Sequence, residues 1–257
     1  MEKETKIISF ANHKGGVGKT TTTASVGSLL SKIGFNILVI DLDAQANLTS
    51  SLMKSVAPQK TIYDAIVRGE ELPITIIDRN LYLVPSSELL AMADVELSSA
   101  ISRESILSRL IKKANKKNRF GVNFDYILID CPPSLGILTL NALTASTDVI
   151  VPLVAEVLPF NGLKMIKNFV STIQRHLNEK VDITGILLTR WENTNLSKSI
   201  EQALRENLGD RVFQTKIRKN VSLAEAPFES KNIVEYAPRS NGAKDYKEFV
   251  EELLKRI

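Results

Sequence analysis

The feature that most constrains this chain is a glycine-rich stretch, Ala11–Thr21, which reads Ala-Asn-His-Lys-Gly-Gly-Val-Gly-Lys-Thr-Thr. It follows an apolar run at residues 7–10 and opens onto a segment with apolar residues at helical spacing, which ends at Gly34. A glycine-rich turn between a strand and a helix is the layout of a phosphate-binding loop, because its backbone N–H groups converge on an anion at the positive end of the helix. The stretch therefore predicts a nucleotide site.

Two lysines stand inside this loop, and the pattern departs from the common form G-x-x-x-x-G-K-[ST]. His13 occupies the position where glycine is expected, and Lys14 follows it. Lys19 would place a point charge beside the phosphates, and the Thr20 hydroxyl would face Mg²⁺. The residues predicted to surround the phosphates are Lys14, Gly15, Gly16, Val17, Gly18, Lys19, Thr20 and Thr21.

Two apolar runs end in an aspartate. Residues 36–41 end at Asp41, and residues 124–130 end at Asp130. Such runs suit parallel strands covered on both faces, and the carboxyl ends of these strands lie at the edge of the sheet where α/β proteins bind ligands. Asp130 matches the Walker B arrangement, in which the carboxylate holds Mg²⁺ through water opposite Thr20. For Asp41 two interpretations stay open, a place in the ligand site or a cap of a helix or turn.

The remaining periodicity predicts an α/β fold in one domain over residues 1–257, with a mostly parallel twisted sheet flanked by helices on both faces. No helix-turn-helix extension is expected before the loop. Further strands are expected at residues 81–85, 148–153 and 182–189, and helices at residues 61–66, 88–110, 196–208 and 244–257. Core contacts around the second of these helices are expected at Ile101, Ile106, Leu107, Leu110 and Ile111.

Composition excludes several other classes of protein. A single cysteine, Cys131, excludes an intrachain disulfide and a cysteine-rich metal site, and we interpret it as a small buried apolar residue. The formal net charge of +4 permits contact with nucleic acid or anionic lipid, although a solvated surface explains it equally well. The chain starts without a signal peptide and has no apolar run of membrane-spanning length, so we expect a cytoplasmic protein.

The glycine-rich loop resembles the deviant Walker A motif, K-G-G-x-x-K-[ST], of the ParA/Soj/MinD family of P-loop ATPases. Residues 41–47 resemble the family segment D-x-D-[PA]-Q-x-N, residues 130–136 resemble D-x-P-P-S-L-G, and residues 218–227 resemble the segment that borders the adenine pocket. The resemblance extends from Lys6 to the last helix. It implies a Mg²⁺-dependent ATP hydrolase that binds ATP and ADP.

The resemblance also implies roles for individual residues. In the family the first lysine of the loop, here Lys14, reaches across a dimer to phosphates bound by the other subunit. The second aspartate after the strand, here Asp43, positions the attacking water. Lys14, Lys19 and Asp43 are therefore the expected catalytic residues. The residues expected near the adenine are Arg218, Lys219 and Asn220.

Family members of the ParA/Soj type bind double-stranded DNA without sequence preference as ATP-sandwich homodimers, and a ParB-type centromere-binding partner stimulates hydrolysis and releases the DNA. The resemblance therefore implies plasmid or chromosome segregation, with the protein at the nucleoid. A solvated surface is the competing interpretation for each basic cluster, and we leave the run at residues 112–119 outside the predicted site. The cations predicted to contact DNA phosphates are Arg190, Lys216, Arg218 and Lys219.

Two other functions remain as alternatives. A MinD-like ATPase would position protein complexes on a membrane or another surface. The apolar stripe of the last helix, residues 244–257, is explained by packing on the sheet, so we expect no stable membrane association. A binding module that uses nucleotide only as a structural ligand would show no turnover, and the presence of Lys19 and Asp43 argues against it.

Overall fold

The computed structural model describes residues 4–53, 57–116, 118–156 and 159–257. In that part of the chain eight strands form one sheet in the order β3-β4-β2-β5-β1-β6-β7-β8. Every pairing is parallel except that of the edge strand β3 with β4. The strands are β1 (Lys6–Phe10), β2 (Ile37–Asp41), β3 (Thr75–Asp78), β4 (Leu81–Val84), β5 (Tyr126–Asp130), β6 (Asp148–Val154), β7 (Asp182–Trp191) and β8 (Val212–Arg218).

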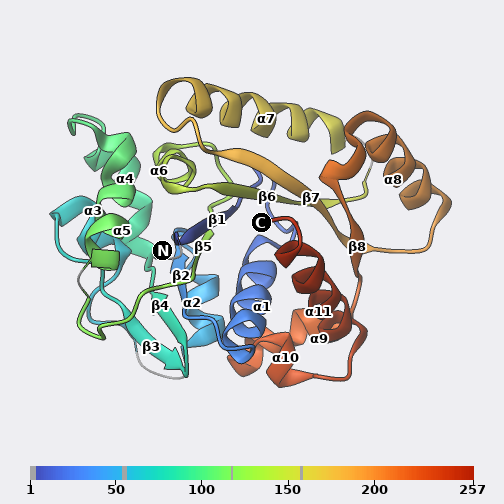
Figure 1. Cartoon of the computed structure of the whole chain (residues 1–257), viewed down its shortest axis with the longest axis horizontal. Helices are drawn as coiled ribbons and strands as arrows, with labels where there is room; N and C mark the ends of the chain where they lie inside the picture. The colour runs from blue at the N-terminus through green and yellow to red at the C-terminus, as the bar shows by residue number, and fades with distance from the viewer. Residues whose placement is uncertain (1–3, 54–56, 117, 157–158) are drawn as a thin grey trace.

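Helices cover both faces of the sheet, as Figure 1 shows. This arrangement confirms the predicted fold of a mostly parallel sheet between two helical layers. One face carries α1 (Lys19–Lys32), α2 (Asn47–Leu52), α10 (Ile233–Tyr236) and α11 (Asn241–Leu254). The other face carries α3 (Ile62–Arg68), α4 (Ala93–Glu96), α5 (Ile106–Lys116), α6 (Ile137–Ala145), α7 (Pro159–His176) and α8 (Asn195–Leu208). Shorter pieces are η1 (Glu88–Met92), η2 (Arg103–Ser105), η3 (Gly209–Arg211), α9 (Val221–Glu225) and η4 (Ala226–Glu229).

The central strands are buried on both faces, which explains why their sequences are continuous apolar runs. All residues of β2 and β5 are buried. Along β2, Leu38 and Ile40 pack into one core, while Ile37 and Val39 pack into the other. A strand that serves two cores has no polar face, so it shows no alternation of polar and apolar residues.

Helix α1 lies directly against the sheet, because its residue Gly27 has no side chain. A Cβ atom at Gly27 would stand 2.9 Å from Cγ1 of Val39. The helix begins at Lys19, beyond the carboxyl end of β1, which pairs with β5 on one side and β6 on the other. The chain runs from β1 to β2 on one side, whereas the connection from β5 to β6 crosses to the other side of β1, so the carboxyl end of β1 is the point of an α/β sheet where ligands bind.

The predicted helix over residues 88–110 is wrong as a continuous element. The structure instead has η1, α4, a turn, η2 and the first residues of α5. The break includes Ser102, whose φ of 52° is left-handed and cannot continue a helix. Ile101, predicted in the core, is 92% exposed in this turn. The other four predicted contacts pack in the core as expected: Ile106, Leu107, Leu110 and Ile111.

Candidate nucleotide site

The backbone of the glycine-rich loop is shaped to receive an anion. Gly16 and Gly18 have φ values of 70° and 85°, a region that glycine adopts without steric cost. Gly18 is the residue before α1, and no side chain caps this helix end. The N–H groups of residues 18–21 donate to none of the described residues, and the first helical bond runs from Thr22 to the carbonyl of Gly18. These uncapped donors at the positive helix end are what phosphate oxygens require.

Neighbouring strands hold the loop in this shape from outside. The Asn12 amide donates to the carbonyl of Pro152 (2.7 Å), and its oxygen accepts from the N–H of Lys14 (3.1 Å). The Thr189 hydroxyl donates to the carbonyl of Val17 (2.8 Å). The chain's own side chains therefore brace the loop, which reduces the entropy lost on binding.

Lys19 lies inside the loop and is only 6% exposed. Its ammonium donates to the carbonyl of Lys14 at 3.1 Å. Burial lowers the pKa of Lys19, and the nearby charge of Asp130 opposes this shift. An anion beside the ammonium would offset the cost of burial, so the site favours a negatively charged ligand.

Lys14 has a different environment, although it lies in the same loop as Lys19. Its ammonium pairs with the carboxylate of Glu156, and the two side chains are 53% and 50% exposed. The hydrogen bond from Lys14 lowers the pKa of Glu156. Lys14 is thus a surface cation beside the loop, whereas Lys19 is a buried cation within it.

Asp41 is a structural acceptor at the end of β2. One of its oxygens accepts from the N–H and the hydroxyl of Thr49 (2.8 and 2.7 Å), and the other accepts from the N–H of Asp43 (3.1 Å). Asp41 therefore fixes the turn that leads from β2 into α2, which supports the capping interpretation. Asp43, in the same turn, lines the cleft described below and accepts from the N–H of Gln45 (3.0 Å).

Asp130 is suited to hold a cation. Its side chain is fully buried at the end of β5, and neither carboxylate oxygen makes a hydrogen bond of good geometry to a described residue. Burial raises the pKa of Asp130, the charge of Asp41 adds to this effect, and the nearby Thr20 hydroxyl opposes it. Buried carboxylate oxygens without partners fit Mg²⁺, which prefers oxygen ligands. Asp130 and Thr20 would hold this ion, and it would neutralise phosphate charge.

A cleft of about 650 Å³ collects most of the predicted nucleotide residues. Lys14, Val17, Asp130 and Lys216 do not line it. Of the predicted residues, those that line the cleft are Gly15, Gly16, Gly18, Lys19, Thr20, Thr21, Asp43, Arg190, Arg218, Lys219 and Asn220. Six further lining residues fall within the family segments at residues 41–47, 130–136 and 218–227 without having been predicted individually: Gln45, Asn47, Pro133, Val221, Leu223 and Ala224. Three lining residues lie outside those segments: Thr189, Ile217 and Tyr246.

Tyr246 shows why a lining residue outside those segments was missed. It stands on α11, far from the loop in sequence, and its hydroxyl is 3.0 Å from the Thr22 hydroxyl on α1. Burial raises the pKa of Tyr246, so the hydroxyl stays protonated and joins the two helices behind the cleft. The apolar stripe of the last helix indicated its burial, but only the fold places it against α1.

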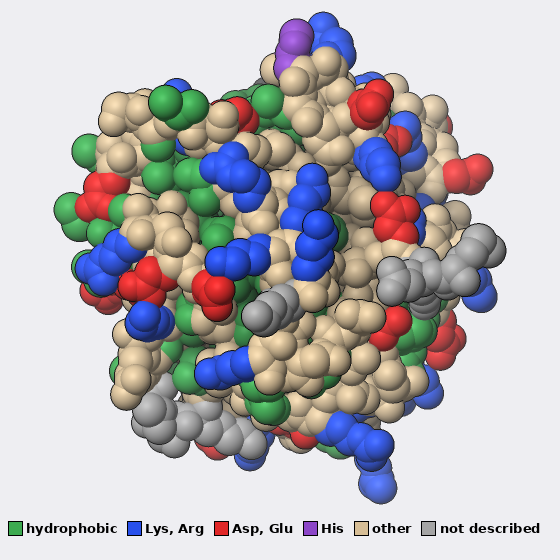
Figure 2. All heavy atoms as spheres, turned by 60° about the vertical axis from the view of Figure 1, so that its left-hand side comes forward, with side chains coloured by type: hydrophobic (Ala, Val, Ile, Leu, Met, Phe, Trp, Pro, Cys, Tyr) green, Lys and Arg blue, Asp and Glu red, His purple; other side chains and the backbone are tan. Residues whose placement is uncertain are grey.

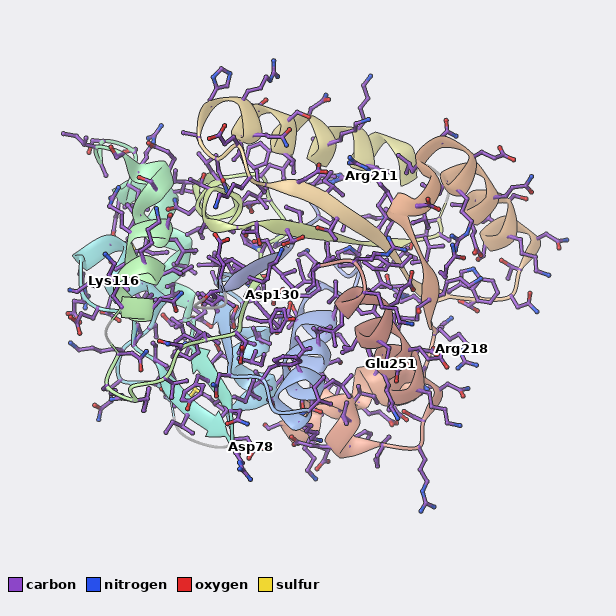
Figure 3. The ribbon with its side chains drawn as sticks, viewed as in Figure 1. Asp78, Lys116, Asp130, Arg211, Arg218 and Glu251 are labelled. Carbon is purple, nitrogen blue, oxygen red and sulfur yellow. The ribbon has the colours of Figure 1, made fainter. Side chains whose placement is uncertain are left out.

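The basic residues at the end of β8 have carboxylate partners within the chain. Nε of Arg218 donates to Asp245 at 3.0 Å, and the ammonium of Lys216 lies 2.9 Å from Glu201. Figure 3 shows Arg218 at the outer edge of the molecule and Asp130 in its interior. Three further contacts complete this edge: Lys219 pairs with Glu192 at 3.0 Å, Lys216 lies over the Trp191 ring at 4.5 Å, and Asn220 accepts from the N–H of Ser222 at 2.9 Å.

These features together define a P-loop site for a nucleoside triphosphate and Mg²⁺. Uncapped amides face the phosphate position, Lys19 supplies charge within the loop, and Asp130 lies at the neighbouring strand end. Residues 5–183 match the family described as AAA domain. The chain is 41% identical over 254 residues to the sporulation initiation inhibitor protein Soj of Bacillus subtilis, covering 96% of this chain and 98% of that protein. The chain therefore belongs to the Soj/ParA family of P-loop ATPases.

Other similar proteins agree with this assignment. A chromosome-partitioning ATPase Soj of Thermus thermophilus is 36% identical over 262 residues, with 100% of this chain and 98% of that protein covered. A Borrelia burgdorferi structure described as a putative plasmid partition protein bound to AMPPNP is 27% identical, with a TM-score of 0.83 over 99% of this chain and 100% of that chain.

A second solved structure holds a nucleotide and a metal ion. It is described as cobyrinic acid a,c-diamide synthase from Mycobacterium smegmatis with bound ADP and magnesium. It is 32% identical, with a TM-score of 0.82 over 98% of this chain and 95% of that chain. The bound ADP and magnesium are consistent with the ligand and metal that the loop and Asp130 would hold.

Among the described residues, no helix is both long enough and apolar enough to cross a membrane. The predicted boundary of a single domain over residues 1–257 stays a prediction.

Proposed function

We propose that this protein is a ParA-type partitioning ATPase, which forms a homodimer around ATP, binds double-stranded DNA without sequence preference and acts in plasmid or chromosome segregation. The observation that carries the proposal is the position of Lys14. Its ammonium lies at the surface beside the loop and does not line the cleft that Lys19 closes. A cation in this position can serve phosphates that a second subunit brings to the same face.

The residues of the cleft supply what phosphoryl transfer to water needs. The reaction requires charge neutralisation and correct positioning more than covalent chemistry. Lys19 with Mg²⁺ at Asp130 and Thr20 would neutralise the phosphates, and Lys14 would add charge from the partner subunit. Asp43 is half-buried at the edge of the cleft, where it would orient the attacking water.

The same proposal assigns the adenine end and the DNA surface. Arg218, Lys219 and Asn220 line the same cleft as the phosphate loop, and the family resemblance of this segment assigns them to the adenine. Together with Arg190 and Lys216 they form one edge of the molecule. DNA phosphates would compete there with the intramolecular partners Glu192, Glu201 and Asp245. In the cell the protein would then be at the nucleoid, and a ParB-type partner would release it by stimulating hydrolysis.

The test of this function is ATP turnover measured with DNA and the ParB-type protein of the same organism. We expect slow turnover alone and a marked increase when both are present. A Lys14→Gln variant should keep ATP binding and lose the increase, because it removes the charge supplied to the partner subunit. Turnover that is insensitive to both additions, but sensitive to anionic vesicles, would favour the MinD-like alternative.

A further inference from the structure

We infer that the exposed face of α5 is a second contact surface for the DNA phosphate backbone, one that works without nucleotide. The inference depends on the proposed function in one respect only, which is that the ligand is taken to be duplex DNA. Figure 2 shows Lys and Arg side chains gathered on the face of the molecule that carries α5. The cations of α5 itself are Arg109, Lys112, Lys113 and Lys116.

The cations of α5 form one stripe along the helix. Arg109, Lys112, Lys113 and Lys116 are all exposed, and their spacing of three and four residues places them on the same side. The helix carries no acidic residue between Ile106 and Lys116. The opposite side is buried through Leu107, Ile111 and Ala114. The stripe is therefore held rigidly by the core and presents only positive charge to solvent.

Most of this charge has no carboxylate partner. Lys113 lies 3.0 Å from Glu71, a pair in which both side chains are more than half exposed. Arg109 donates to the hydroxyl of Ser105 at 2.6 Å, which is a neutral partner. Within the described residues, no carboxylate lies within salt-bridge distance of Lys112 or Lys116. Lys117 lies outside the described residues.

The contrast with the edge at β8 points to α5. There Lys216, Arg218 and Lys219 are each paired with a carboxylate, so DNA must displace an existing partner. At α5 only Lys113 is paired with a carboxylate, whereas Arg109, Lys112 and Lys116 have no carboxylate partner among the described residues. Figure 3 labels Lys116 and Arg218 on opposite sides of the molecule, and no residue of α5 lines the nucleotide cleft. Binding at α5 should therefore be independent of nucleotide.

Duplex DNA fits this stripe better than a lipid surface does. The stripe is about 10 Å long at 1.5 Å per residue. Duplex DNA carries about one negative charge per 1.7 Å of its axis when both strands are counted, so about six phosphates lie along the same length of duplex. Stable membrane binding also needs apolar side chains that insert between lipids, and the exposed positions of α5 carry none.

The experiment measures binding of the full chain to a labelled random-sequence duplex without nucleotide, across a salt series. The double variant Lys112→Glu/Lys116→Glu is compared with the matched control Lys164→Glu/Lys167→Glu, which reverses two exposed lysines of α7. Circular dichroism and the melting temperature confirm that each variant folds. A Lys112→Arg/Lys116→Arg variant keeps the positive charge and tests whether charge at these positions is sufficient for DNA binding.

In the absence of nucleotide, the α5 variant should bind at least about tenfold more weakly at low salt, and its slope of log K against log salt should flatten by about two. The control and the arginine variant should match the wild type. Equal slopes for the α5 variant and the control would overturn the inference, as would a wild type that binds no DNA without nucleotide. Loss that is seen only with phosphatidylglycerol vesicles would overturn it in favour of a membrane.

The proposed function has a separate readout in the same experiment. It predicts an additional gain in affinity when ATP is present, on top of the nucleotide-free binding. If that gain is absent while the α5-dependent binding persists, the proposed function fails and the α5 surface stands. If the gain is present and the α5 variant binds as the control does, only the α5 surface fails.

Discussion

Asp41 and Asp130 occupy matching positions at the carboxyl ends of the neighbouring parallel strands β2 and β5, and both side chains are 0% exposed. Asp41 is satisfied by the Thr49 N–H, the Thr49 hydroxyl and the Asp43 N–H. Asp130 has no such partners among the described residues. Two aspartates with the same place in the fold therefore serve different purposes, since one organises the turn and the other is left for a cation.

This difference predicts how stability depends on pH. Burial raises the pKa of Asp41 from its ordinary 3.8 to about 6. Between these values the folded protein binds more protons than the unfolded chain, so stability falls as the pH rises through this window, by about 3 kcal/mol from this group. In the Asp41→Asn variant this position has no carboxyl group to titrate. The difference in unfolding free energy between wild type and variant should change by this amount between about pH 4 and about pH 7, and a constant difference would contradict it.

Lys19→Met should weaken nucleotide binding strongly. The substitution removes the charge inside the loop, and each charge-assisted hydrogen bond to phosphate contributes about 1.5–3 kcal/mol, which corresponds to roughly tenfold to a hundredfold in affinity. Stability without nucleotide should be kept or raised, because burial lowers the pKa of Lys19 and its ammonium is costly to bury. Titration calorimetry and melting curves measure both. Affinity near that of the wild type would refute the loop assignment.

Asp43→Ala should bind ATP, hydrolyse it at least about a hundredfold more slowly, and accumulate as an ATP-bound dimer. The side chain lines the cleft, and within the described part of the chain its one hydrogen bond is accepted from the N–H of Gln45, so the fold should tolerate its loss. Turnover assays and light scattering in the presence of ATP measure these two effects. Unchanged turnover would remove Asp43 from the catalytic role.

Lys219→Glu should weaken ATP-dependent DNA binding and leave stability unchanged. Its pair with Glu192 has side chains that are 60% and 53% exposed, and such surface pairs contribute little to stability. Arg218→Gln is the informative comparison, because it leaves the buried carboxylate of Asp245 without its cation and should also lower the melting temperature. Loss of ATP binding in Lys219→Glu would mean that this segment serves the nucleotide and not the DNA.

Much of the fold was predictable because its central strands are long apolar runs. The sequence indicated the strands at β1, β2 and β5 and the loop that follows β1, since burial on both faces leaves a strong signal. The short edge strand β3 was missed, because its residues alternate between half-buried and exposed and it contains Asp78. Helix α2 was missed as well, since its start depends on the distant acceptor Asp41 and not on a local cap.

The candidate site also contains features that could be predicted from the sequence and features that could not. The loop and the strand-end carboxylates could be predicted, because their spacing is local. The partners of the basic residues could not be, since Arg218 meets Asp245 and Lys216 meets Glu201 only through packing of β8 with α11 and α8. The helix over residues 88–110 failed for a related reason, because composition favours a helix there but does not reveal the left-handed turn at Ser102.

The measurement that tests the central claim most directly is the affinity for non-specific duplex DNA with ATP, with ADP and without nucleotide, across a salt series. The account predicts the tightest binding and the steepest salt dependence with ATP, because the dimer doubles the phosphate contacts that each molecule makes. Binding of the same affinity and salt slope in all three states would contradict the claim that ATP controls attachment to DNA.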